Sequence, residues 1–133
     1  MINLKEKTAI VTGASRGIGL EITRVLASRG ANIAMIATKE NKELASSLEA
    51  EFNVKIVSYA CDVSSSEMVE STFKNIIETF GAVDILVNNA GITRDGLLMR
   101  MKDEDFDDVL RINLRSVFIC TKAVARHMMG RRQ

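Results

Sequence analysis

The sequence predicts an α/β protein, a doubly wound parallel sheet with flanking helices. Short apolar runs alternate with segments of helical periodicity four times along the chain, and the connections between them are short. A cluster of three glycines separates the first apolar run from the first helical segment. Alternation of this kind is typical of parallel strands joined by right-handed helical crossovers.

The first strand is expected over Thr8 to Val11, because a short continuous apolar run is typical of a strand buried on both faces. A helix follows the glycines and reaches Arg29, with apolar residues at helical spacing. Gly30 stands where a glycine commonly ends a helix.

The pattern then repeats. Further strands are expected over Ile33 to Ala37, Val54 to Ala60 and Ile85 to Val87, and further helices over about Lys42 to Glu51 and Ser66 to Phe80. The segment from Ile92 to Lys102 is expected to be an irregular or briefly helical loop.

A long helix of about six turns is predicted from Phe106 onward. Its apolar residues recur three, four and seven apart, at Val109, Leu110, Leu114, Val117, Phe118, Val124 and Met128. Acidic residues at positions 103–105 precede this stripe, and Arg126, Arg131 and Arg132 close it. Both ends therefore suit the helix dipole.

Composition is that of one globular domain. The 133 residues are 47% hydrophobic and 26% charged, with a formal net charge of +1. Near-neutral charge disfavours a nucleic-acid binder, and no apolar run approaches the roughly 18 residues of a membrane span. Because the N-terminus lacks the apolar core of a signal peptide, we expect a cytoplasmic protein. No composition shift marks a boundary, so residues 1–133 are treated as one domain.

No metal site is expected. Cys61 and Cys120 lack CxxC spacing, so they are interpreted as buried thiols. His127 is the only histidine and is expected to be a surface residue near the end of the long helix.

The glycine cluster runs from Thr12 to Gly19, with Gly13, Gly17 and Gly19 in the spacing G-x-x-x-G-x-G. A glycine turn between a strand and a helix presents backbone N–H groups to a phosphate, which favours a dinucleotide site of the Rossmann type. The spacing differs from G-x-G-x-x-G, and no Gly-Lys-Ser/Thr follows as in a mononucleotide P-loop. A tight turn without a ligand is the alternative.

The end of the second strand bears on the choice of cofactor. Enzymes that use NAD place a carboxylate there for the ribose 2′-hydroxyl, whereas a 2′-phosphate requires a cation. Here no carboxylate precedes Glu40, and Arg16 and Lys39 are the available cations. NADP is therefore favoured over NAD, unless both cations are merely solvated.

Polar residues also follow the third and fourth strands, at the edge where open α/β sheets bind ligands. Asp62 could accept from an adenine amino group, or cap the next helix together with Ser64 and Ser65. The run Asn88-Asn89-Ala90-Gly91 combines two amides with a glycine that allows close approach of a ligand, but two asparagines could also simply form a turn.

Asn113 lies on the apolar stripe of the long helix, where an amide without a partner would cost about 1–3 kcal/mol. It must therefore have a partner. Bonding a backbone group or holding a water would be a structural role, and membership of a functional site is the other interpretation.

These motifs together resemble those of the short-chain dehydrogenase/reductases. The shared elements are Thr12-Gly13-x-x-x-Gly17-x-Gly19, Asp62-Val63, Asn88-Asn89-Ala90-Gly91 and an asparagine in the long helix. Residues 88–102 are similar to the bacterial 3-oxoacyl-[acyl-carrier-protein] reductases, which usually have Asn where Gly96 stands. The resemblance covers essentially the whole chain.

The resemblance implies roles for individual residues. Gly13, Ala14, Ser15, Arg16 and Ile18 would line the pyrophosphate and 2′-phosphate, in the turn that Gly17 and Gly19 complete. Thr38 would touch the adenosine phosphate, Asp62 and Val63 would hold adenine, and Asn89, Ala90 and Gly91 would lie at the ribose. Asn113 would be the helix member of the catalytic tetrad.

The family reaction would reduce a 3-oxoacyl thioester on acyl-carrier protein with NADPH, and family members are commonly homo-oligomers, here by analogy a tetramer with the long helix at an interface. A Tyr-x-x-x-Lys pair would supply the proton, yet the only tyrosine, Tyr59, is followed four residues later by Val63. The chain is therefore expected to be the N-terminal half of a longer enzyme, truncated before the catalytic segment and inactive alone. A non-catalytic module that binds nucleotide or pairs with another chain is the alternative.

Overall fold

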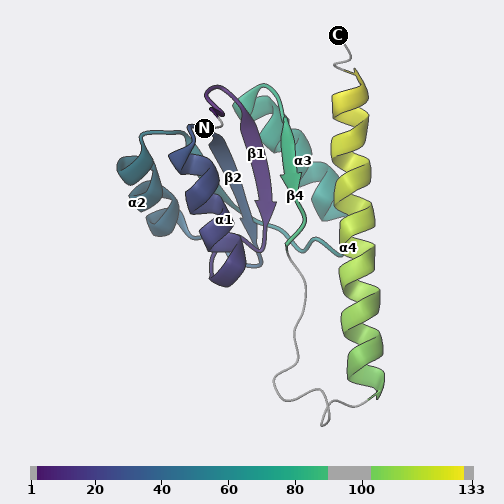
Figure 1. Cartoon of the computed structure of the whole chain (residues 1–133). Coiled ribbons are helices and arrows are strands. Elements are labelled where there is room, and N and C mark those ends of the chain that lie inside the picture. The colour runs from purple at the N-terminus through teal and green to yellow at the C-terminus, as the bar shows by residue number, and fades with distance from the viewer. Residues whose placement is uncertain (1–2, 90–102, 131–133) are drawn as a thin grey trace.

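The computed structural model describes residues 3–89 and 103–130, with the side chains of 3–89 and 117–130 (Figure 1). The elements in chain order are β1 (Thr8–Thr12), α1 (Gly17–Ser28), β2 (Asn32–Ala37), α2 (Lys42–Phe52), β3 (Ile56–Ala60), α3 (Ser66–Phe80), β4 (Ile85–Val87) and α4 (Asp103–Gly130). The predicted alternation of strands and helices is confirmed.

The strands form a parallel sheet in the order β3-β2-β1-β4. The chain first moves outward from β1 through β2 to β3, and then crosses back to place β4 on the other side of β1. This reversal makes the space between the ends of β1 and β4 a topological switch point, where open α/β sheets bind ligands. The predicted doubly wound fold class is confirmed.

Each face of the sheet is covered by its own pair of helices (Figure 1). On one face, Val11 packs in a cluster with Ala27 of α1 and Leu48 of α2. On the other face, Ile10 packs in a cluster with residues of α3 and α4. The alternation of Ile10 and Val11 between the two faces explains why β1 is apolar at successive positions.

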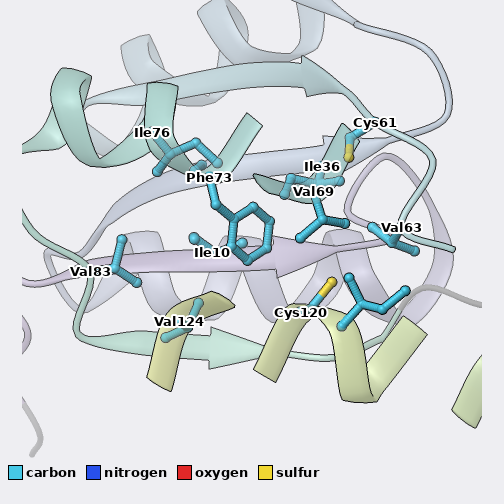
Figure 2. Packing of buried hydrophobic residues seen from close by; sticks show 12 residues of the cluster. Ile10, Ile36, Cys61, Val63, Val69, Phe73, Ile76, Val83, Cys120 and Val124 are labelled. Atoms are coloured by element: carbon cyan, nitrogen blue, oxygen red, sulfur yellow. The ribbon is translucent and has the colours of Figure 1, made fainter. Parts of the chain in front are cut away.

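Figure 2 shows the second cluster, with Phe73 of α3 lying over Ile10 and with Cys120 and Val124 of α4 facing the sheet. Cys61 and Cys120 are both buried free thiols, as expected. Burial raises the pKa of Cys120 to about 12, and it also raises that of Cys61. Both thiols are therefore protonated, unreactive core residues at neutral pH.

Two boundaries differ from the sequence-based expectation. β3 begins at Ile56 rather than Val54, because Asn53 adopts a left-handed conformation (φ 55°) at the end of α2 and the chain must still turn before pairing. α4 begins at Asp103 and spans 28 residues, about eight turns rather than six. Acidic residues 103–105, expected ahead of the apolar stripe at the start of this helix, form its first turn. Residues 92–102 lie outside the described part.

The predicted apolar stripe of α4 is only partly the face that packs. Ile119, Cys120 and Val124 are buried, whereas Val117 and Phe118 are exposed. Over residues 117–124, α4 carries apolar side chains on two sides. Among the described residues, the sheet and α3 cover only one of these sides. His127 is also not a simple surface residue, because its Nε2 accepts a hydrogen bond from the Val83 N–H at 3.2 Å.

Candidate cofactor site

Parallel pairing brings the carboxyl ends of the strands to one edge of the sheet. β1 is followed by the glycine turn, β2 by Thr38, β3 by Cys61 and Asp62, and β4 by Asn88 and Asn89. The sequence-predicted residues on these four segments therefore gather at the edge that includes the switch point.

The glycines of the turn meet two different requirements. Gly13 and Gly17 adopt positive φ angles, 64° and 56°, which a residue with a Cβ rarely does. Gly19 is needed for space, because a Cβ there would overlap the Gly13 carbonyl and crowd the Asn89 amide. The turn thus folds tightly against the start of α1, as a phosphate cradle requires.

Among the described residues, no side chain caps the N-terminus of α1. α2 and α3 are capped by Asn41 and Ser65, whose side chains accept from the backbone N–H groups of Leu44 and Met68. Both helices also carry a glutamate in the first turn. α1 begins after Arg16 with no side-chain cap and no acidic residue in its first turn. Its N–H groups and positive dipole end are therefore available to an anion.

The other residues of the turn divide between core and surface. Ala14 is fully buried and donates its N–H to the carbonyl of Ile36, which fixes the turn on the end of β2. Ser15 is half-buried, and Arg16 and Ile18 are exposed. The side chains of Arg16 and Ile18 are thus open to solvent, and Ala14 supports the turn from beneath.

Thr12 and Asn89 join the ends of β1 and β4. The Thr12 hydroxyl donates to the Val87 carbonyl at 3.3 Å and accepts from the Asn89 N–H at 3.0 Å. The Asn89 side chain in turn donates to the Gly13 carbonyl at 3.2 Å. Sequence reasoning did not assign this positioning role to Thr12, and only its place directly before the glycine turn signals it.

Asp62 bonds within its own loop rather than capping α3. Its Oδ1 accepts from the Ser64 hydroxyl at 2.6 Å and from the Ser64 N–H at 3.0 Å, and these bonds lower the pKa of the carboxyl. Ser65 is the residue that caps α3. Among the described residues, Oδ2 of the exposed Asp62 makes no hydrogen bond and can accept one from a ligand. The Val63 side chain is buried in the core, so only its backbone could contact a ligand.

Three of the predicted site residues lie wholly or partly outside the described part of the chain. Ala90 and Gly91 lie outside the described residues. Asn113 falls within α4, but its side chain is also outside the described part. Thr38 and Lys39 are described and exposed at the end of β2.

The described side chains contain no cluster of three or more His, Cys, Asp or Glu residues that could hold a metal. Among the helices of residues 3–89 and 103–130, none is both long and apolar enough to cross a membrane.

Comparisons with known proteins agree with the predicted fold class. The family described as short chain dehydrogenase matches residues 7–133. The 3-oxoacyl-[acyl-carrier-protein] reductase FabG of Vibrio cholerae is 51% identical over 132 residues, 99% of this chain and 53% of that protein. This chain therefore spans about half the length of that relative.

Solved structures share the fold. A 3-oxoacyl-[acyl-carrier protein] reductase from Brucella melitensis in complex with NAD has a TM-score of 0.83 and 32% identity, over 96% of this chain and 51% of the other. An alcohol dehydrogenase from Thermococcus sibiricus complexed with 5-hydroxy-NADP has a TM-score of 0.81 and 36% identity, over 92% of this chain and 53% of the other.

Proposed function

Because the chain belongs to the short-chain dehydrogenase/reductase family, we propose that it is the cofactor-binding half of an NADPH-dependent 3-oxoacyl-[acyl-carrier-protein] reductase of fatty-acid synthesis. The identity of 51% to a reductase of that name, over nearly all of this chain, is the observation that carries the proposal. The acyl-carrier protein with its 3-oxoacyl thioester is then the partner, and the cytoplasm the compartment.

The residues at the switch point fit a nicotinamide dinucleotide. The uncapped N–H groups of α1 would bind the pyrophosphate, since no described side chain caps them and the first turn carries no acidic residue. Asp62 would accept from the adenine amino group through Oδ2. When bound, the cofactor supplies the hydride that reduces the 3-oxo group.

Selectivity for NADPH would depend on cations near the adenosine ribose. Arg16 and Lys39 are exposed, and no acidic residue stands at positions 37–39 to bond a 2′-hydroxyl. A guanidinium suits a phosphate because it donates two parallel hydrogen bonds. Relatives of this fold are described with either NAD or an NADP derivative, so the argument for NADPH comes from these side chains.

Reduction of the 3-oxo group also requires a proton, and a group other than Tyr59 must supply it. Tyr59 packs against the core, and burial raises the pKa of its hydroxyl, which suits neither access to substrate nor ready proton release. We therefore propose that the 133-residue chain alone does not turn over, although Asn113 would belong to the catalytic set. Reduction of an acetoacetyl thioester by mass-verified protein of this length would contradict this.

The cofactor assignment is tested by reversing the charge of Arg16. Arg16→Glu should weaken NADPH binding by roughly 10-fold or more, the scale of a lost charge-assisted hydrogen bond, and change NADH binding far less. Dissociation constants for both cofactors can be measured by fluorescence titration. Lys74→Glu, on the exposed face of α3, is the charge-matched control. Equal losses for the two cofactors would refute the assignment.

A further inference from the structure

We propose that Ser58, a buried residue of β3, is a positioning residue that holds the Thr38–Asn41 loop in place and thereby sets the preference for NADPH over NADH. This inference rests on the proposed function, because that loop carries Lys39. Ser58 itself lies beneath the loop and would touch no ligand.

Ser58 is a polar residue at an apolar position. It is 6% exposed and lies two residues after Ile56, so both side chains point to the face of the sheet that α1 and α2 cover. A hydroxyl there is unfavourable unless it is hydrogen-bonded. Its Oγ accepts from the backbone N–H of Asn41 at 2.8 Å, so the hydroxyl is used to fix a loop.

The loop it fixes is short and held at both ends. Before the loop, the Ala37 carbonyl accepts from the Cys61 N–H at 2.9 Å. After it, Asn41 is bound to Ser58 through its N–H and caps α2 through its side chain, which accepts from Leu44 at 3.0 Å. Three exposed residues, Thr38, Lys39 and Glu40, span the gap between these anchors.

The second anchor is the one that a side-chain substitution can remove. Without the Ser58 bond, the backbone that carries Lys39 is held directly to β3 only at Ala37, and its position relative to the ribose becomes less defined. Contacts to a 2′-phosphate would weaken, because charge-assisted hydrogen bonds depend on distance and direction. The pyrophosphate contacts at α1 would remain, so selectivity should change rather than overall affinity.

The test compares Ser58→Val with Ser58→Thr. These side chains have nearly the same shape and differ in the hydroxyl, so strand propensity and packing are matched. Binding of NADPH and NADH is titrated for both variants and for the wild-type chain, and thermal unfolding is followed in parallel. Ser46→Ala, an exposed serine of α2, is the control.

The ratio of NADPH to NADH affinity should fall by about 3- to 10-fold in Ser58→Val and stay near wild type in Ser58→Thr, with NADH affinity unchanged in both. A lower melting temperature with an unchanged ratio, or equal losses for both cofactors, would overturn the inference. A ratio equally low in both variants would do the same, since it would not depend on the hydroxyl.

The two proposals fail differently. If wild type prefers NADPH and Arg16→Glu removes that preference, an unchanged ratio in Ser58→Val overturns only the role of Ser58. If wild type shows no preference, the NADPH assignment and the role of Ser58 both fall.

Discussion

His127 ties the C-terminal half of α4 to the segment that leads into β4. Its Nε2 accepts from the Val83 N–H, which requires a neutral imidazole with its proton on Nδ1. At the other end of β4, the Asn88 side chain donates to the Thr121 hydroxyl at 3.2 Å. Two side-chain hydrogen bonds, one at each end of a three-residue strand, therefore orient α4.

Removing this acceptor should destabilise the fold. His127→Ala is expected to lower the free energy of unfolding by about 1 kcal/mol, whereas His127→Gln should lose less because its amide oxygen can also accept. Urea unfolding measures both, with Arg126→Gln, at the preceding residue of α4, as control. Unfolding curves for His127→Ala that coincide with wild type would show that the bond contributes nothing.

At the scale of the element, α1 combines an open N-terminus with close packing of its first turn. Gly19 lies against the Gly13 carbonyl and the Asn89 amide, so the helix, the turn and the end of β4 meet at one point. One turn later, the buried Thr23 hydroxyl donates to the Gly19 carbonyl at 2.9 Å. These contacts hold the helix start rigidly at the place proposed for the phosphate.

A methyl group at position 19 should push the start of α1 away from the glycine turn and the end of β4. Gly19→Ala is expected to cost about 1–3 kcal/mol through overpacking and to abolish cofactor binding, because the neighbouring atom is backbone and cannot move aside. Gly130→Ala is the matched control, since a Cβ there meets nothing within 4 Å and alanine favours a helix. Calorimetry and NADPH titration measure both effects. Normal NADPH binding by Gly19→Ala would contradict this packing argument.

At the scale of the whole molecule, apolar side chains remain exposed on helices from both sides of the sheet. Ile18 of α1 is 73% exposed, and Phe118 of α4 is 67% exposed. β4 is also an edge strand among the described residues. Only the C-terminal half of α4 lies beside the sheet, and its N-terminal half extends past it (Figure 1). Exposed apolar surface next to an open strand edge favours association.

The 133-residue chain is therefore expected to self-associate at micromolar concentrations. Phe118→Lys should shift the equilibrium toward monomer without lowering thermal stability, because the ring is mostly in water. Sedimentation velocity over a concentration series measures this, with Lys74→Gln as control for a surface change elsewhere. A dilute wild-type monomer that unfolds cooperatively throughout the series would contradict the prediction.

The sequence alone determined the order and type of the elements and the edge of the sheet at which the proposed cofactor residues lie. Apolar runs, helical spacing and the glycine turn are local signals, and the carboxyl ends of parallel strands meet at one edge whatever the details of packing. Thr12, Ser58 and His127 could not be assigned in this way. Each bonds a residue distant in sequence, so its role exists only once the sheet is assembled.

The packing of α4 was likewise decided by tertiary structure. Its apolar residues occupy more than one side, and periodicity does not say which side meets α3 and the sheet. The open end of α1 stands between these cases. The sequence shows that α1 lacks a capping residue, whereas α2 and α3 have one. Only the fold shows that this uncapped end lies at the edge of the sheet where ligands of such folds bind.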